Sequence, residues 1–170
     1  SSACFISGVV SLLTGNAKDD RYTLGKKSMF GHRTRSDLKD NDNYPLRRFY
    51  LDTNDLAIKM VIERYFTAIQ KTLWKNKGSD SIVFRTIGIS AQFDFLKELL
   101  VSKKVSLGKD LEFESILCNF SDITFDNEFF SPRTATKKRI MDVFRLKVGL
   151  ISEDSVAAEI VSAANMNNLC

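Results

Sequence analysis

The chain has 170 residues, a length that fits one compact domain or one domain with an extra lobe. Hydrophobic residues make up 44% of it, including 13 phenylalanines, so it can bury a sizeable core. The net charge of +4 is too small to identify a partner, and the single histidine excludes a multi-histidine metal site. The apolar runs are too short to span a bilayer, and no basic region precedes the first of them, so a membrane anchor and a signal peptide are not expected.

Three cysteines, Cys4, Cys118 and Cys170, lie far apart and show no metal-ligand spacing. We expect them to be reduced, as in a cytoplasmic protein. The first residue is Ser1 rather than Met, so we expect the chain to be a segment of a longer protein.

The first predicted element is a short buried helix over Ala3–Leu13, which ends before Gly15. Residues 15–44 are polar and contain three glycines, so we expect a mobile loop there. The clearest element follows from Ile58 to about Trp74, where apolar residues recur at steps of three and four. Asp55 and its polar neighbours suit the start of that helix.

The second half of the chain also indicates helices. Residues 81–85 are ambiguous between strand and helix, and the further helices are expected at about 89–101, 111–120, 134–148 and 152–164. We therefore predict an all-α fold, an irregular orthogonal bundle of about five or six helices with at most one short strand or hairpin, in one domain whose helical core is 45–170.

No motif of known chemistry is present in the chain. There is no phosphate-binding glycine loop, nucleophile elbow, Cys-x-x-Cys or His-Glu-x-x-His pattern. His32 lies in a polar, glycine-flanked loop where no partner would fix it as a base. We expect no catalytic residue, no metal site and no cofactor.

A basic block at 133–147 is the strongest binding candidate. Lys138, Arg139 and Arg145 fall on one side of a predicted helix and could meet nucleic-acid phosphates. The alternative is that this face is solvated, or that it pairs with the neighbouring acidic segment 110–128.

A second basic zone precedes the long helix. It combines cations with nearby aromatic residues, as proteins that bind single strands or phosphate backbones do. Its candidate contacts are Lys26, Lys27, Arg47 and Arg48, with Arg33 and Arg35 beside them.

The order of features over residues 44–100 resembles the helical C-terminal half of the DGQHR-domain proteins, which include the DndB-type proteins of DNA phosphorothioation systems. The resemblance is carried by Pro45–Leu51, by Arg64–Ile69 within the long helix, by Ile82–Ile89 and by Phe93–Leu99. It implies a bacterial or archaeal protein in which a motif-bearing N-terminal domain precedes this chain, with a role tied to DNA modification, defence or its regulation.

The Asp-Gly-Gln-His-Arg signature is absent from the 170 residues. No residue role can therefore be transferred from that motif, and the resemblance implies an accessory domain that serves packing, oligomerisation or DNA contact. Two other interpretations remain open. One is a protein-interaction or homo-oligomerisation module whose partner surface is the acidic segment with Phe125, Phe129 and Phe130. The other is an enzyme whose unrecognised site is supplied by loop 15–44.

Overall fold

The computed structural model describes residues 2–28, 31–108, 112–125, 128–131, 133 and 135–165. These residues confirm the all-α class: their regular structure is helical apart from one pair of two-residue strands. The α-helices are α1 (Ser2–Leu13), α2 (Ala17–Gly25), α3 (Arg47–Leu51), α4 (Asp55–Lys71), α5 (Thr86–Val101), α6 (Phe113–Leu117), α7 (Thr136–Lys147) and α8 (Ala158–Ala164). The strands are β1 (Lys27–Ser28) and β2 (Gly31–His32), and the 3-10 turns are η1 (Arg35–Asp37), η2 (Ile82–Phe84), η3 (Cys118–Asp122), η4 (Glu128–Phe130) and η5 (Glu153–Ser155).

The described helices outnumber the expected five or six, mainly because short segments form helices of their own. Residues 15–44, expected as a loop, contain α2, an antiparallel pairing of β1 with β2, and η1. The expected last helix is divided into η5 and the shorter α8.

The long helix α4 forms as its apolar spacing predicts. Asn54 caps it, because the Asn54 side chain accepts a hydrogen bond from the Ala57 amide at 3.1 Å. The helix ends at Lys71, three residues earlier than expected, and Trp74 lies in the following turn. Its apolar side is buried at Ile58, Val61, Ile62, Tyr65, Ala68 and Ile69.

Helix α5 is the centre of the body and packs against α1 on one side and α7 on another. It begins at Thr86 and includes Gly88, which the sequence places before the helix. A Cβ on Gly88 would lie 2.1 Å from the Ile82 carbonyl oxygen, so only glycine lets η2 approach the helix so closely.

Two groups of aromatic rings in mutual contact link the helices around α5. Phe5, Phe66 and Phe93 join α1, α4 and α5, with ring centroids 4.9 to 5.1 Å apart. Phe95, Phe120 and Phe144 join α5, η3 and α7 at 5.2 to 5.7 Å. Aromatic contacts thus join α1, α4, α5, η3 and α7, beside the aliphatic side chains of the core.

Buried hydrogen bonds of Gln92 tie the turn after α4, η2 and α5 together inside this apolar core. Gln92 is fully buried, and its amide donates to the carbonyls of Val83 and Gly88. The Gln92 Oε1 accepts from the Trp74 indole at 3.1 Å. Each buried polar atom of this side chain therefore has a partner.

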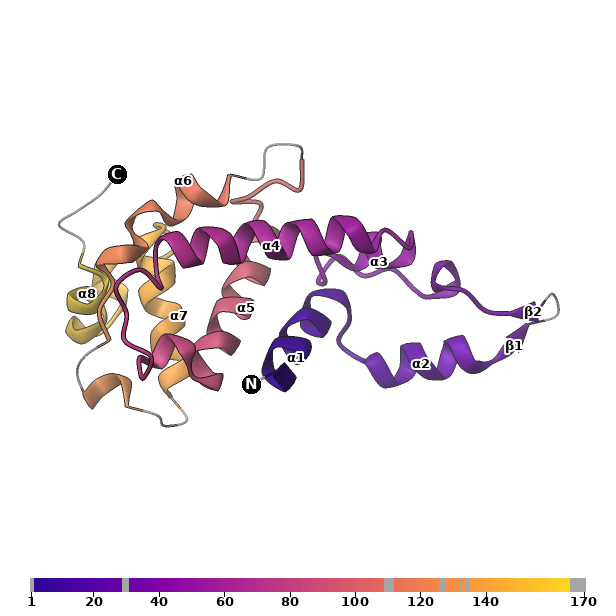
Figure 1. Ribbon diagram of the computed structural model, residues 1–170, viewed down its shortest axis with the longest axis horizontal. Helices are drawn as coiled ribbons and strands as arrows, with labels where there is room; N and C mark the ends of the chain where they lie inside the picture. The colour runs from indigo at the N-terminus through magenta and orange to yellow at the C-terminus, as the bar shows by residue number, and fades with distance from the viewer. Residues whose placement is uncertain are drawn as a thin grey trace.

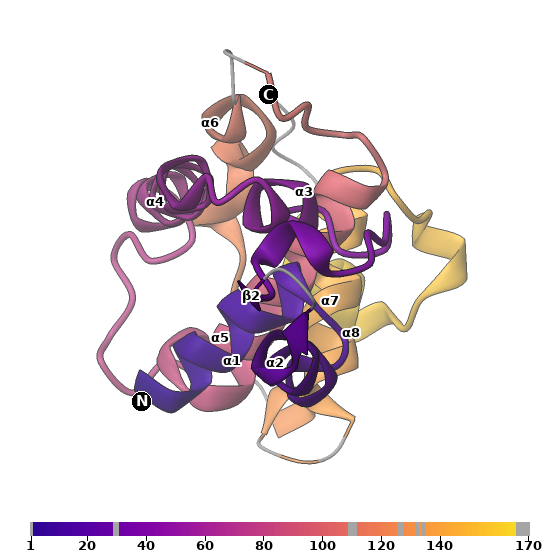
Figure 2. The same ribbon diagram turned by 90° about the vertical axis from the view of Figure 1, so that its right-hand side faces the viewer.

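An arm projects from one end of the body (Figure 1). It contains α2 and the β1–β2 pair, whereas α1, α4 and α5 lie in the body. In the view along the arm, α4 and α6 lie on one side of the body and α1, α5 and α7 on the other (Figure 2). In the described part of the chain, no helix is long and apolar enough to span a membrane.

Candidate nucleic-acid interface

Arg47, expected to contact phosphate, is a buried structural residue at the base of the arm. It starts α3 and is 5% exposed. Its guanidinium donates to both carboxylate oxygens of Asp20, at 2.6 and 3.0 Å, and to the carbonyls of Lys39 and Leu13. The hydrogen bond from Arg47 lowers the pKa of the Asp20 carboxyl group. Arg47 is therefore not available to a DNA backbone.

Its neighbour Arg48 is at the surface, with 70% of its side chain exposed. It pairs with Asp52 at 3.1 Å, one turn along the chain, and with Asp40 at 3.6 Å. Exposed pairs of this kind contribute little stability and are easily exchanged for other anions. Arg48 thus keeps its predicted accessibility, with two acidic neighbours beside it.

The basic helix α7 uses most of its cations inside the protein. Arg145 is half-buried and donates to Glu98 at 2.9 Å and to Asp142 at 3.0 Å. Arg139 donates to the Phe129 carbonyl, and its guanidinium carbon lies 3.9 Å from the centre of the Phe129 ring. Lys138 is exposed and forms no ion pair among the described residues. Of the three predicted contacts on α7, only Lys138 is free to reach a partner.

The acidic segment 110–128 does not neutralise this face within the described residues. The ion pairs of α7 with other elements run to α5, because Lys137 pairs with Asp94 and Arg145 with Glu98. The phenylalanines of the acidic region fill the core: Phe130 is 2% exposed, and Phe125 packs against it at 4.9 Å. These rings therefore do not form the exposed partner surface of the interaction hypothesis.

The arm carries the remaining predicted cations. Lys26 is exposed at the end of α2, and its ammonium lies 4.3 Å from the centre of the Tyr22 ring. Lys27 lies on β1, where its backbone is opposite His32 of β2 in the antiparallel pair. Arg33 follows β2 and is exposed, with no ion pair among the described residues. Arg35, by contrast, is held by Asp55 and lies over the Tyr50 ring.

Lys147 is a buried cation that sequence reasoning missed. It is 7% exposed at the end of α7 and donates to the Asn165 carbonyl at 3.0 Å, where α8 ends. Burial lowers the pKa of its ammonium group, an effect that nearby Asp122 opposes. This contact secures α8 and has no feature of a binding site.

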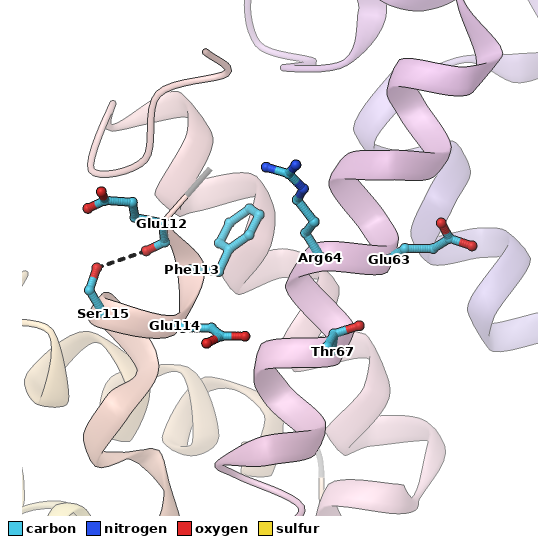
Figure 3. Close-up of a pocket in the computed structure, with 7 residues that line it drawn as sticks. All are labelled: Glu63, Arg64, Thr67, Glu112, Phe113, Glu114 and Ser115. Carbon is cyan, nitrogen blue, oxygen red and sulfur yellow. Dashed lines mark hydrogen bonds between the residues drawn. The ribbon is translucent and has the colours of Figure 1, made fainter. Parts of the chain in front are cut away.

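A pocket of about 520 Å³ lies between α4 and α6 (Figure 3). Arg64 extends from α4 toward the Phe113 ring, and Glu112 and Glu114 lie on the α6 side. Glu114 pairs with Lys71 on the rim. None of the predicted DNA-contacting residues lines this pocket, and its residues show no nucleophile beside a base.

No cluster of three or more metal-ligating side chains occurs in the described part of the chain. Cys4 is a free thiol whose Sγ lies 3.3 Å from the Thr86 carbonyl. Cys118 is disulfide-bonded, so the expectation that it is reduced is wrong. Cys170 lies outside the described residues.

No protein-family model matches the chain, and no curated protein or solved structure is significantly similar to it.

Proposed function

We propose that this chain is the helical accessory domain of a DGQHR-type protein linked to DNA modification, defence or its regulation, and that it contacts the DNA backbone. The residues that carry the resemblance lie on α3 and the two residues before it, on α4, on η2 and along α5. These elements are neighbours in the body, where α3 packs on α4 and η2 on α5. An accessory role is consistent with the absence of the family's signature motif from the chain.

The observation that supports DNA contact is that some predicted cations are bound by the protein itself, whereas others are exposed without an ion pair among the described residues. Arg35, Arg47, Arg139 and Arg145 are all engaged by carboxylates or carbonyls of the protein itself. On the arm, Lys26 and Arg33 are exposed and form no ion pair among the described residues. On the body, Lys138 is exposed in the same way.

Free cations attract phosphates at long range, whereas paired ones contribute little to the field. The proposed phosphate contacts are therefore Lys26 and Arg33 on the arm, with Lys138 on the body. This assigns the arm the larger share of the interface, because it carries two of these three residues and projects from the body (Figure 1).

The test is binding of the chain to a fluorescent DNA duplex at low salt, followed by anisotropy. Lys26→Glu combined with Arg33→Glu should weaken binding strongly. A control that changes the net charge equally, Lys75→Glu with Lys103→Glu, alters exposed lysines in loops after α4 and α5 and should have a much smaller effect. Absence of binding at low salt, or equal losses in both variants, would contradict the proposal.

The family assignment has a separate test in the coding sequence around this chain. An Asp-Gly-Gln-His-Arg signature upstream in the same reading frame would support it. An upstream stretch of unrelated sequence that lacks the signature would count against it.

A protein-interaction module is the second candidate, and exposed apolar side chains on α4 favour it. Leu56 is 75% exposed and Met60 is 40% exposed, one turn apart on the same side of the helix. Contiguous exposed apolar surface often marks a site of protein interaction. Native mass spectrometry tests this function. A dimer that is lost in the double variant Leu56→Ala with Met60→Ala, and whose formation does not depend on added DNA, would favour it.

A further inference from the structure

Helix α2 buries none of its residues, which is unusual for a helix joined to a packed body. It is held instead by polar contacts: Asn16 caps its first turn, and Asp20 pairs with the buried Arg47. A short helix that buries no apolar face gains little from packing. The side of α2 that faces away from the body is therefore open to a binding partner.

One of the two carboxylates of α2 is neutralised by an ion pair with the body, whereas its cations are exposed. The Asp20 carboxylate points to the body, where Arg47 neutralises it, and the Asp19 carboxylate accepts a hydrogen bond from the side chain of Asn16 at the helix start. Lys18 and Lys26 are exposed and form no ion pair among the described residues. The net charge that α2 presents to the solvent is thus positive.

An exposed aromatic ring lies between these two lysines. Tyr22 is 67% exposed and follows Lys18 by four residues, which places both on one side of the helix. The Lys26 ammonium lies 4.3 Å from the ring centre on the same side. The three residues, Lys18, Tyr22 and Lys26, form what we call the α2 stripe.

From this arrangement we infer that the α2 stripe binds single-stranded nucleic acid, with an unpaired base stacked on Tyr22 and the neighbouring phosphates held by Lys18 and Lys26. This combination of an exposed ring with flanking cations is how proteins hold single strands without reading their sequence. A duplex keeps its bases stacked inside and offers the ring no partner, so single strands are preferred. The inference rests on the proposed function and names the form of nucleic acid that the arm takes.

The experiment compares binding of the whole chain to a fluorescent oligothymidylate and to a duplex of equal length. Tyr22→Ala should weaken single-strand binding about fivefold or more, the loss expected for one stacked base. Tyr22→Phe keeps the aromatic face and should bind within about twofold of the wild type. Ile6→Ala, which removes a similarly exposed apolar side chain on α1, should bind normally.

The outcomes separate this inference from the proposed function. Unchanged single-strand binding in Tyr22→Ala, or binding of the wild type to the duplex alone, overturns the stacking inference while leaving backbone contact intact. Absence of binding to either nucleic acid overturns both. Because Tyr22 is exposed and α2 buries no residue, an unfolded variant is not expected, and the far-ultraviolet circular dichroism of each variant checks this.

Discussion

Replacing Arg47 by Met should destabilise the protein strongly, although sequence reasoning places this residue on a binding surface. Arg47 and Asp20 have side chains only 6% and 15% exposed. The substitution removes two hydrogen bonds to Asp20 and leaves the Lys39 and Leu13 carbonyls without this donor. Breaking one half of a buried ion pair costs about 3–5 kcal/mol, because the remaining charge is buried without a partner.

For a chain of this size, 1 kcal/mol lowers the melting temperature by about 2–4 °C, so a decrease of roughly 6–20 °C is expected. Urea unfolding followed by circular dichroism measures the free energy directly. The matched control is Arg48→Met, one residue along, whose side chain is 70% exposed and whose loss should cost less than about 1 kcal/mol. Equal losses in the two variants would refute the structural role assigned to Arg47.

Three further predictions address the same packing. Gly88→Ala should lower the free energy of unfolding in urea by about 1–3 kcal/mol, because the added Cβ would overlap the Ile82 carbonyl. Gly25→Ala is the control, since nothing lies within 4 Å of its added Cβ and stability should change little. Equal losses in the two variants would contradict the close approach of η2 to Gly88. Gln92→Leu leaves the Trp74 indole N–H without its acceptor, so the free energy of unfolding should fall by about 1–3 kcal/mol. The fluorescence of Trp74 should shift as well, and an unchanged emission spectrum would argue against this contact. Because the folded pKa of Asp20 lies below its unfolded value of about 3.9, its ion pair stabilises the protein above that pH and is lost as the pH falls through the lower folded pKa. Asp20→Asn should accordingly flatten the acid side of the stability profile, and an unchanged profile would refute this.

The long helices could be predicted because their signals are local. The apolar spacing from Ile58 onward and the capping side chain of Asn54 lie within one stretch of chain, and α4 forms there. Helix α2 was missed because its stability does not come from an apolar face, so periodicity gives no signal. Its main tertiary anchor, Asp20 with Arg47, joins residues 27 positions apart.

The candidate site was only partly predictable for the same reason. Charged side chains usually lie at the surface, so the sequence alone predicts exposed cations at Lys26, Arg48 and Lys138. The structure shows all three exposed. The neighbouring sequence does not distinguish Arg145 from Lys138. The fold alone brings Glu98, 47 residues away, next to Arg145. Which cations remain free is thus a property of the tertiary structure.

The most direct test of the account is the salt dependence of duplex binding. Each phosphate contact contributes about 0.9 to the slope of log binding constant against log salt concentration. Lys26→Gln with Arg33→Gln should therefore reduce the slope by about 1.8, while Lys75→Gln with Lys103→Gln should leave it unchanged. A slope that stays at the wild-type value in the arm variant would contradict the claim that the free cations of the arm bind phosphates.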